Sequence, residues 1–259
     1  MKRRNLFVGA AMMAMTLALN SAMAFYGHDD FTGASMNESL WGELENGTSP
    51  EVTFDLDGEG RLGFTTSEDG EEMDGRWGWL GVGSATRAWE VRLDIGNSLT
   101  EAEFEHGQAA WLGMSIGTFT GSPHFFEFAY DIFGWEGTMY RQVMFGAWKA
   151  EGEEEFDGVD VGDVDRVLLS ISFDPAAFSL HADYSLDQGM SMERLTSYDL
   201  TGWEDALANG FFLMLKGMAD YIVLDHGDLY ANSFTAIPEP STWLLFGISL
   251  LWFVNRRRR

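Results

Sequence analysis

The sequence predicts an all-β fold: a single β-sandwich or jelly roll over residues 25–236, with one short helix near residues 201–209. Three observations lead to this prediction. Many short segments alternate apolar with polar residues, turn residues separate these segments, and one segment alone has a good helical pattern. A strand needs such alternation when one of its faces is buried and the other is solvated. Many short strands separated by turns favour a sandwich or jelly roll.

The clearest alternation places Trp89, Val91, Leu93 and Ile95 on one face of a strand. The strands expected on this basis are residues 51–56, 61–66, 88–95, 109–118, 124–131, 137–145, 166–173, 177–185, 211–216, 219–225 and 228–234.

The segment "TGWEDALANG" predicts the helix, with Thr201 as its N-cap and Gly210 just beyond its end. Pairs such as Asp69-Gly70 and Asp174-Pro175 suit the turns between strands, because Gly and Asp tolerate positive φ and Pro fixes its own φ. We find no interior linker and no internal repeat, which favours one domain.

The charge of the chain is strongly acidic, with a formal net charge of −25. Residues 25–236 hold forty of the 41 acidic residues and nine of the 16 basic ones. Such a surface should repel nucleic acid and anionic membranes, and it should attract cations. The chain has no cysteine, which excludes disulfides, zinc-thiolate sites and thiol catalysis.

The first 24 residues have the pattern of a secretory signal peptide. Three basic residues precede an apolar stretch from Leu6 to Leu19, and Ala22 and Ala24 are small residues of the kind that signal peptidase reads. We expect cleavage after Ala24. The alternative is an amphipathic N-terminal helix of the folded domain.

The last residues, 237–259, combine a Pro-Glu-Pro triplet, an apolar run and a basic end. Pro238, Glu239 and Pro240 precede an uncharged, mainly apolar run over residues 242–254, which is short for a transmembrane helix. The four arginines, Arg256, Arg257, Arg258 and Arg259, should stay in the cytoplasm by the positive-inside rule. The acidic domain would then face the exterior.

This ending resembles the PEP-CTERM sorting signal. The resemblance implies recognition by an exosortase, a membrane transpeptidase-like enzyme that cuts near the triplet, in a Gram-negative bacterium that makes exopolysaccharide. The expected route is an inner-membrane intermediate with transient membrane association, followed by the cell surface or extracellular matrix. A permanent single-pass anchor is the alternative.

The domain itself resembles concanavalin A-like, laminin-G-type jelly rolls. The resemblance rests on "DDFTGASMNESLWG" near the start and "ADYIVLDHGDLYANSFTA" at the end. In that fold the first and last strands pair, which implies that Asp30 and Phe31 lie near residues 232–234.

Few residues indicate catalysis. Ser115 lies in a Gly-x-Ser-x-Gly pattern, but no helix is expected after it, so an apolar strand explains the pattern equally well. A glycosidase would need two carboxylates about 5–9 Å apart. Glu127 and Asp131 share a strand face but lie roughly 13 Å apart by strand rise. We therefore expect no catalytic residue, and a glycan-active enzyme is the lesser alternative.

No cofactor is expected from the sequence. Calcium is the alternative, because two turns collect oxygen ligands beside glycine. The candidate ligands are Asp55, Asp57, Glu59, Asp157, Asp160 and Asp163. Hairpin turns with solvated charges are the favoured explanation of these residues. The five histidines are scattered singly without metal-ligand spacing.

Most tryptophans are expected in the core, whereas Trp135, flanked by glycines, is expected at the surface.

Three functions remain open on this evidence. The first is a non-enzymatic exported protein of the cell surface or matrix, associated with extracellular polysaccharide. The second is a carbohydrate-binding module, which calcium would assist. The third is a glycan-active enzyme. The fold alone does not choose among them, because jelly rolls serve all three.

Overall fold

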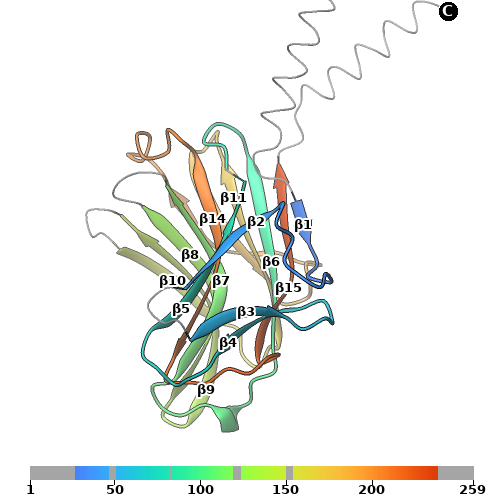
Figure 1. Ribbon diagram of the computed structural model, residues 1–259. Helices are drawn as coiled ribbons and strands as arrows, with labels where there is room; N and C mark the ends of the chain where they lie inside the picture. Colours follow the sequence, from blue (N-terminus) through green and yellow to red (C-terminus); the bar gives the residue numbers. More distant parts are fainter. Residues whose placement is uncertain (1–26, 47–50, 82, 119–123, 150–153, 239–259) are drawn as a thin grey trace, which may run out of the picture.

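The structure is a computed structural model that describes residues 27–46, 51–81, 83–118, 124–149 and 154–238 (Figure 1). The predicted signal peptide and its cleavage site therefore lie outside the described residues. So do Glu239, Pro240 and the terminal arginines. Among the residues that are described, no helix is long and apolar enough to cross a membrane.

The chain folds into two antiparallel sheets, as the all-β prediction requires. The eight-stranded sheet has the order β13 (Glu193–Asp199), β12 (Ser179–Ser185), β11 (Arg166–Asp174), β6 (Trp89–Asn97), β15 (Leu229–Pro238), β4 (Leu62–Thr66) and β3 (Val52–Leu56), with β1 (Gly27–Asp29) also paired to β15. The seven-stranded sheet has the order β10 (Glu154–Asp160), β9 (Thr138–Trp148), β8 (Phe125–Trp135), β7 (Ala109–Thr118), β14 (Phe211–Asp220), β5 (Met73–Trp79) and β2 (Trp41–Asn46). A short 3-10 helix, η1 (Glu101–Glu103), follows β6.

The core lies between the two sheets and follows the predicted alternation. In β6, Trp89, Val91, Leu93 and Ile95 are at most 3% exposed, and the polar residues between them are half-buried. The core-facing side chains of β11 and β8 are likewise buried. Burial of apolar surface stabilises a fold by about 25 cal/mol per Å². This layer is therefore the main source of stability.

The first and last strands pair, as the concanavalin A-like resemblance implied. Asp29 lies opposite Phe234, and Gly27 lies opposite Ala236. Phe234 packs between Trp41 and Trp79, with ring centroids 5.2 and 4.8 Å away. The Trp41 indole donates a 2.9 Å hydrogen bond to Asp29 Oδ2, which fixes this corner of the sandwich.

The predicted helix near residues 201–209 is wrong. The segment forms successive turns, in which Leu207 N donates to Trp203 O but most neighbouring bonds span only three residues. Trp203 is buried and stacks on Phe126 with centroids 4.7 Å apart. Gly202 has a φ of 92°, which is incompatible with a helix. Packing of the tryptophan thus overrides a weak local preference.

Two other predictions also need correction. The separate strand expected at residues 219–225 does not form, because β14 continues to Asp220 and Tyr221 then turns with a φ of 53°. Asp157 and Asp160, which were expected on a Gly-containing turn, lie instead on the edge strand β10. Its antiparallel pairing with β9 leaves its last residue, Asp160, opposite Gln142.

Replacement of Phe234 by alanine should lower the free energy of unfolding by about 3–5 kcal/mol, because it leaves a cavity between two tryptophans. Ile237 is on the same strand but is 37% exposed, so Ile237→Ala should change the free energy by only about 0.5 kcal/mol. Chemical denaturation followed by tryptophan fluorescence measures both. Equal effects of the two variants would contradict the assigned packing.

Candidate functional site

A cavity of about 800 Å³ opens at one end of the sandwich, between the edges of the two sheets. Three segments line it: the end of β6 with the loop into η1, the start of β9, and the loop between β10 and β11. Local hydrogen bonds hold these loops in place. Asp160 Oδ1 accepts from Gly162 N at 2.7 Å, and Asn97 N donates to Asp165 O at 2.9 Å.

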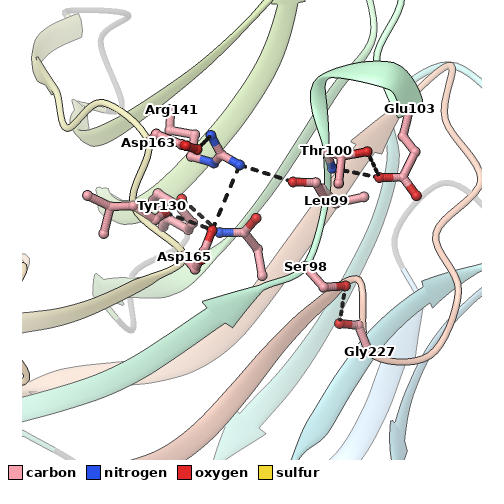
Figure 2. Close-up of polar contacts among 11 residues, drawn as sticks. Ser98, Leu99, Thr100, Glu103, Tyr130, Arg141, Asp163, Asp165 and Gly227 are labelled. Carbon is pink, nitrogen blue, oxygen red and sulfur yellow. Dashed lines mark hydrogen bonds and ion pairs between the residues drawn. The ribbon is translucent and has the colours of Figure 1, made fainter.

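η1 is held at the rim by its own first turn. Glu103 Oε2 accepts from both the backbone N and the hydroxyl of Thr100, each at 2.6 Å (Figure 2). These hydrogen bonds lower the pKa of the Glu103 carboxyl. Ser98 Oγ donates to Gly227 O at 3.0 Å and ties the same loop to the turn before β15. The rim is therefore preorganised by side chains that cap its loops.

Arg141 links the two sheets at the back of the cavity. Its side chain is only 7% exposed, and Nη1 donates to Asp163 Oδ1 at 2.5 Å while Nη2 donates to Leu99 O at 3.0 Å. Figure 2 shows the guanidinium reaching from β9 toward both loops. A buried charge needs such partners, since burial without them costs several kcal/mol.

Tyr130 and Asn97 form a second buried polar contact beside Arg141. The Tyr130 hydroxyl donates to Val164 O, and Asn97 Nδ2 donates to the Tyr130 oxygen at 2.9 Å. Burial raises the pKa of Tyr130, so the hydroxyl stays protonated. Within the described part of the chain, Asn97 Oδ1 and Arg141 Nε are buried without a hydrogen-bond partner. These two atoms are buried behind the surface of the cavity.

The mouth of the cavity combines carboxylates with an aromatic surface. Carboxylates of Glu101, Asp160, Asp163 and Asp165 lie along it. Tyr140, 37% exposed, also lines the cavity and stacks on Phe133 with centroids 5.3 Å apart.

Trp135 lies next to this mouth, at the hairpin between β8 and β9. It is opposite Thr138, a lining residue, and is 52% exposed, which confirms the surface position predicted for it. The rings of Trp135 and His106 are in contact, with centroids 4.6 Å apart.

The carboxylates singled out in the sequence lie elsewhere, on the outer face of β8. Glu127 forms an ion pair with Lys216, whose ammonium lies 5.0 Å from the centroid of the Trp111 ring. Asp131 accepts from Gln142 Nε2 at 2.7 Å and is 8% exposed. Burial raises the pKa of Asp131 to about 6, against the lowering effect of the Gln142 hydrogen bond. Glu127 and Asp131 thus have separate partners and do not act as a pair.

Ser115 lies in the middle of β7, opposite Glu127 on β8 and Met214 on β14. It is 2% exposed, and β7 continues past it to Thr118. A nucleophile elbow needs a sharp turn from a strand into a helix. The strand explanation of the Gly-x-Ser-x-Gly pattern is therefore confirmed.

The calcium candidates are not gathered into a binding site. Among the described residues, no three His, Asp or Glu side chains could together hold a metal ion. Asp57 binds Arg61, with Nε 2.8 Å from Oδ2, and also accepts from the backbone N of Glu59. Asp163 forms an ion pair with Arg141 and does not join neighbouring carboxylates around a cation. Calcium binding there stays an untested alternative, without support from this geometry.

Sequence reasoning missed Arg141, although a signal was available. In β9 the core-facing positions are Met139, Arg141, Val143 and Phe145, so an arginine occupies an apolar register. A charge at such a position indicates either a strand end or a buried ion pair. Asn97 likewise occupies a core-facing position, at the end of the β6 alternation.

Comparison with protein-family models gives one decisive result. Residues 236–259 match the PEP-CTERM protein-sorting motif. The chain therefore carries the sorting motif that the Pro-Glu-Pro triplet and the basic end predicted. No curated protein matches the sequence.

Solved structures share the fold at low sequence identity. An endo-1,3-β-glucanase from Streptomyces sioyaensis is 15% identical with a TM-score of 0.55, covering 83% of this chain and 96% of its own. The winged bean acidic lectin, complexed with methyl-α-D-galactose, is 10% identical with a TM-score of 0.51, covering 82% and 99%. The CBM2 module of the evolved Dit of Lactobacillus casei BL23 phage J-1 is 10% identical with a TM-score of 0.54, covering 83% and 96%. These similarities confirm the concanavalin A-like jelly roll.

The raised pKa of Asp131 predicts a pH-dependent contribution to stability. Between about pH 4 and the pKa of about 6, the Asp131 carboxyl keeps its proton in the folded chain but loses it in the unfolded chain. The free energy of unfolding should therefore fall as the pH rises through this window, by at most about 3 kcal/mol.

Asp131→Asn keeps an acceptor for Gln142 and should remove this dependence, so the variant should gain stability over the natural chain at pH 7 but not at pH 4. Denaturation at both pH values measures the difference, with the exposed Asp157→Asn as a control. The same stability difference at pH 4 and pH 7 would contradict the prediction.

Proposed function

We propose that this protein is exported, sorted by an exosortase through its PEP-CTERM tail, and binds extracellular polysaccharide at the cell surface without hydrolysing it. The observation that carries the binding role is the preorganised cavity at the end of the sandwich, with polar groups inside and exposed aromatic rings at its mouth. Sorting and binding are separate parts of the proposal, and each has its own test.

The sorting part is supported by the matched motif at residues 236–259 and by the signal-peptide pattern at residues 1–24. Signal peptidase and an exosortase would be the partners during export. The expected path leads through the inner membrane of a Gram-negative bacterium to the cell surface or matrix. Membrane association would be transient on this path.

The carbohydrate part is supported by the chemistry of the cavity. Sugars present both hydroxyl donors and oxygen acceptors, which suit the carboxylates at the mouth and the guanidinium of Arg141 at the back. Trp135 and Tyr140 offer ring faces, against which the apolar face of a sugar can pack. Four carboxylates against one arginine favour neutral or amino sugars over anionic ones. The structural neighbours include proteins that are named as a glucanase and a lectin.

The non-enzymatic part is supported by the positions of the acidic groups. Glu127 is neutralised by Lys216, and Asp131 lies four residues along the same strand. The separation of about 13 Å exceeds the distance that either glycosidase mechanism uses. Hydrolysis remains the second candidate, because the neighbours include glycoside hydrolases.

The position of the cavity relative to the tail also supports the proposal. The cavity begins at Asn97, which lies opposite Leu229, whereas the tail leaves at Pro238, opposite Trp89. The ten residues of β15 separate these points by roughly 30 Å. The cavity would therefore face away from the membrane while the tail is still inserted.

Trp135→Ala should weaken polysaccharide binding at least tenfold, because it removes the exposed ring beside the cavity. Phe156→Ala is the matched control, since Phe156 is similarly exposed, at 57%, but lies opposite Gly146, which does not line the cavity, whereas Trp135 lies opposite the lining residue Thr138. Binding is measured by pull-down and by a glycan array with the exported protein.

Three outcomes would contradict the binding role or its location. Equal losses of binding affinity in both variants would show that the site is not at the cavity. Absence of binding to any polysaccharide of the host would refute the binding role. Release of reducing sugar that Asp131→Asn abolishes would establish the hydrolase alternative in its place.

Replacement of Pro238, Glu239 and Pro240 by alanines should leave the full-length protein in the membrane, because the exosortase loses its recognition motif. Fractionation and immunoblotting measure this, with the natural chain in cells that lack the exosortase as a control. Unchanged processing of the alanine variant would refute the sorting role.

A further inference from the structure

The exposed Trp135 ring lies on a turn of unusual backbone geometry. β8 ends at Trp135 and β9 begins at Thr138, so Glu136 and Gly137 make the whole connection. Both have positive φ, 52° for Glu136 and 80° for Gly137. Glycine adopts this conformation readily, whereas a side chain disfavours it. A contact from outside the turn can therefore decide how firmly the turn is held.

His106 supplies that contact with a single side chain. Its Nδ1 accepts a hydrogen bond from the backbone N of Glu136 at 3.2 Å. Its ring lies against the Trp135 ring, with centroids 4.6 Å apart and planes tilted by 52°. His106 thus holds both the strained residue of the turn and the aromatic ring that precedes it.

The segment that carries His106 is itself fixed on β8. Gly107 N donates to Gly134 O at 3.0 Å, and Gly134 N donates to Gln108 O at 2.9 Å. A Cβ at Gly134 would lie 2.1 Å from Glu105 O, so glycine is needed for this close approach. Gln108 Oε1 also accepts from Glu105 N at 2.7 Å. His106 is therefore presented to the hairpin from a rigid support.

Both partners belong to the rim of the cavity. Trp135 lies opposite Thr138, which lines the cavity, and His106 follows shortly after the lining residue Glu101. A side chain that moves freely before binding loses that freedom on binding, which lowers the affinity. A ring that is already held loses less. Contact with His106 should therefore increase the affinity of any ligand that packs on Trp135.

We propose that His106 is a positioning residue for carbohydrate binding, which holds the Trp135 ring at the cavity mouth and does not contact the sugar. This inference rests on the proposed binding of polysaccharide at the cavity. The two residues are far apart in the sequence, because the whole of β7 and most of β8 separate them. Their contact is therefore visible only in the structure.

A double-mutant cycle with the exported protein and purified extracellular polysaccharide of the host tests this role. His106→Ala should weaken binding about threefold to tenfold, because the ring is no longer held before binding. In a chain that already carries Trp135→Ala, the same change should have no further effect, since His106 acts through the missing ring. Titration of the immobilised polysaccharide measures all four affinities.

Two further variants make the cycle specific. His106→Asn places a carbonyl oxygen where Nδ1 can be replaced as the acceptor for Glu136 N, so it should regain most of the affinity that alanine loses. His28→Ala is the matched control, because His28 is also exposed and lies 2.8 Å from Thr235 Oγ1, near the other end of β15. It should bind like the natural chain.

Three results would overturn the inference while the binding role stands: natural affinity of His106→Ala, an asparagine variant as weak as the alanine variant, or losses that multiply in the double variant. Multiplied losses would show that His106 contacts the sugar itself. Absence of binding by the natural chain would overturn the binding role and this inference with it.

Discussion

The central position of the last strand is the constraint on which the rest of the structure depends. β15 lies inside the eight-stranded sheet, paired with β6 along its length and with β4 and β1 along its other edge. The sheet is therefore incomplete until residues 229–238 are in place. Such long-range pairing is slow to form, because loop closure precedes any gain from contacts. The domain can therefore finish folding only when almost the whole of its chain is available.

The sequence predicted the strands that alternate apolar with polar residues, and it missed β2, β5, β10 and β13. Of these four strands only β5 is interior, whereas the edge strand β3 was predicted. Central strands such as β6 have one face against the other sheet, so Val91 and Leu93 alternate with half-buried polar residues. The edge strands β10 and β13 have many exposed residues on both faces, which removes that alternation. The helix prediction failed at Trp203, because burial under Phe126 is a tertiary effect that no local pattern contains.

The same distinction applies to the candidate site. Trp135 was predicted at the surface from its flanking glycines alone, because hairpin turns are local features. The cavity could not be predicted, since Asn97 and Arg141 belong to different sheets and meet only through the pairing order. Composition alone makes the acidic turn residues candidate cation ligands, whereas in the structure Asp163 forms an ion pair with Arg141. Composition gives the charges, but topology decides which partner neutralises each of them.

The two ends of β15 lie beside the two regions on which the proposed function rests, the cavity and the sorting triplet. Leu229, at the start, lies beside the strand end that borders the cavity, and Pro238, at the finish, begins the sorting triplet. A strand in the middle of a sheet is rigid, because its backbone bonds are satisfied on both sides. The distance between the cavity and the membrane-directed tail is therefore fixed by strand rise and does not depend on a linker. In the proposed function, this strand therefore holds the cavity and the tail at opposite ends of the sandwich.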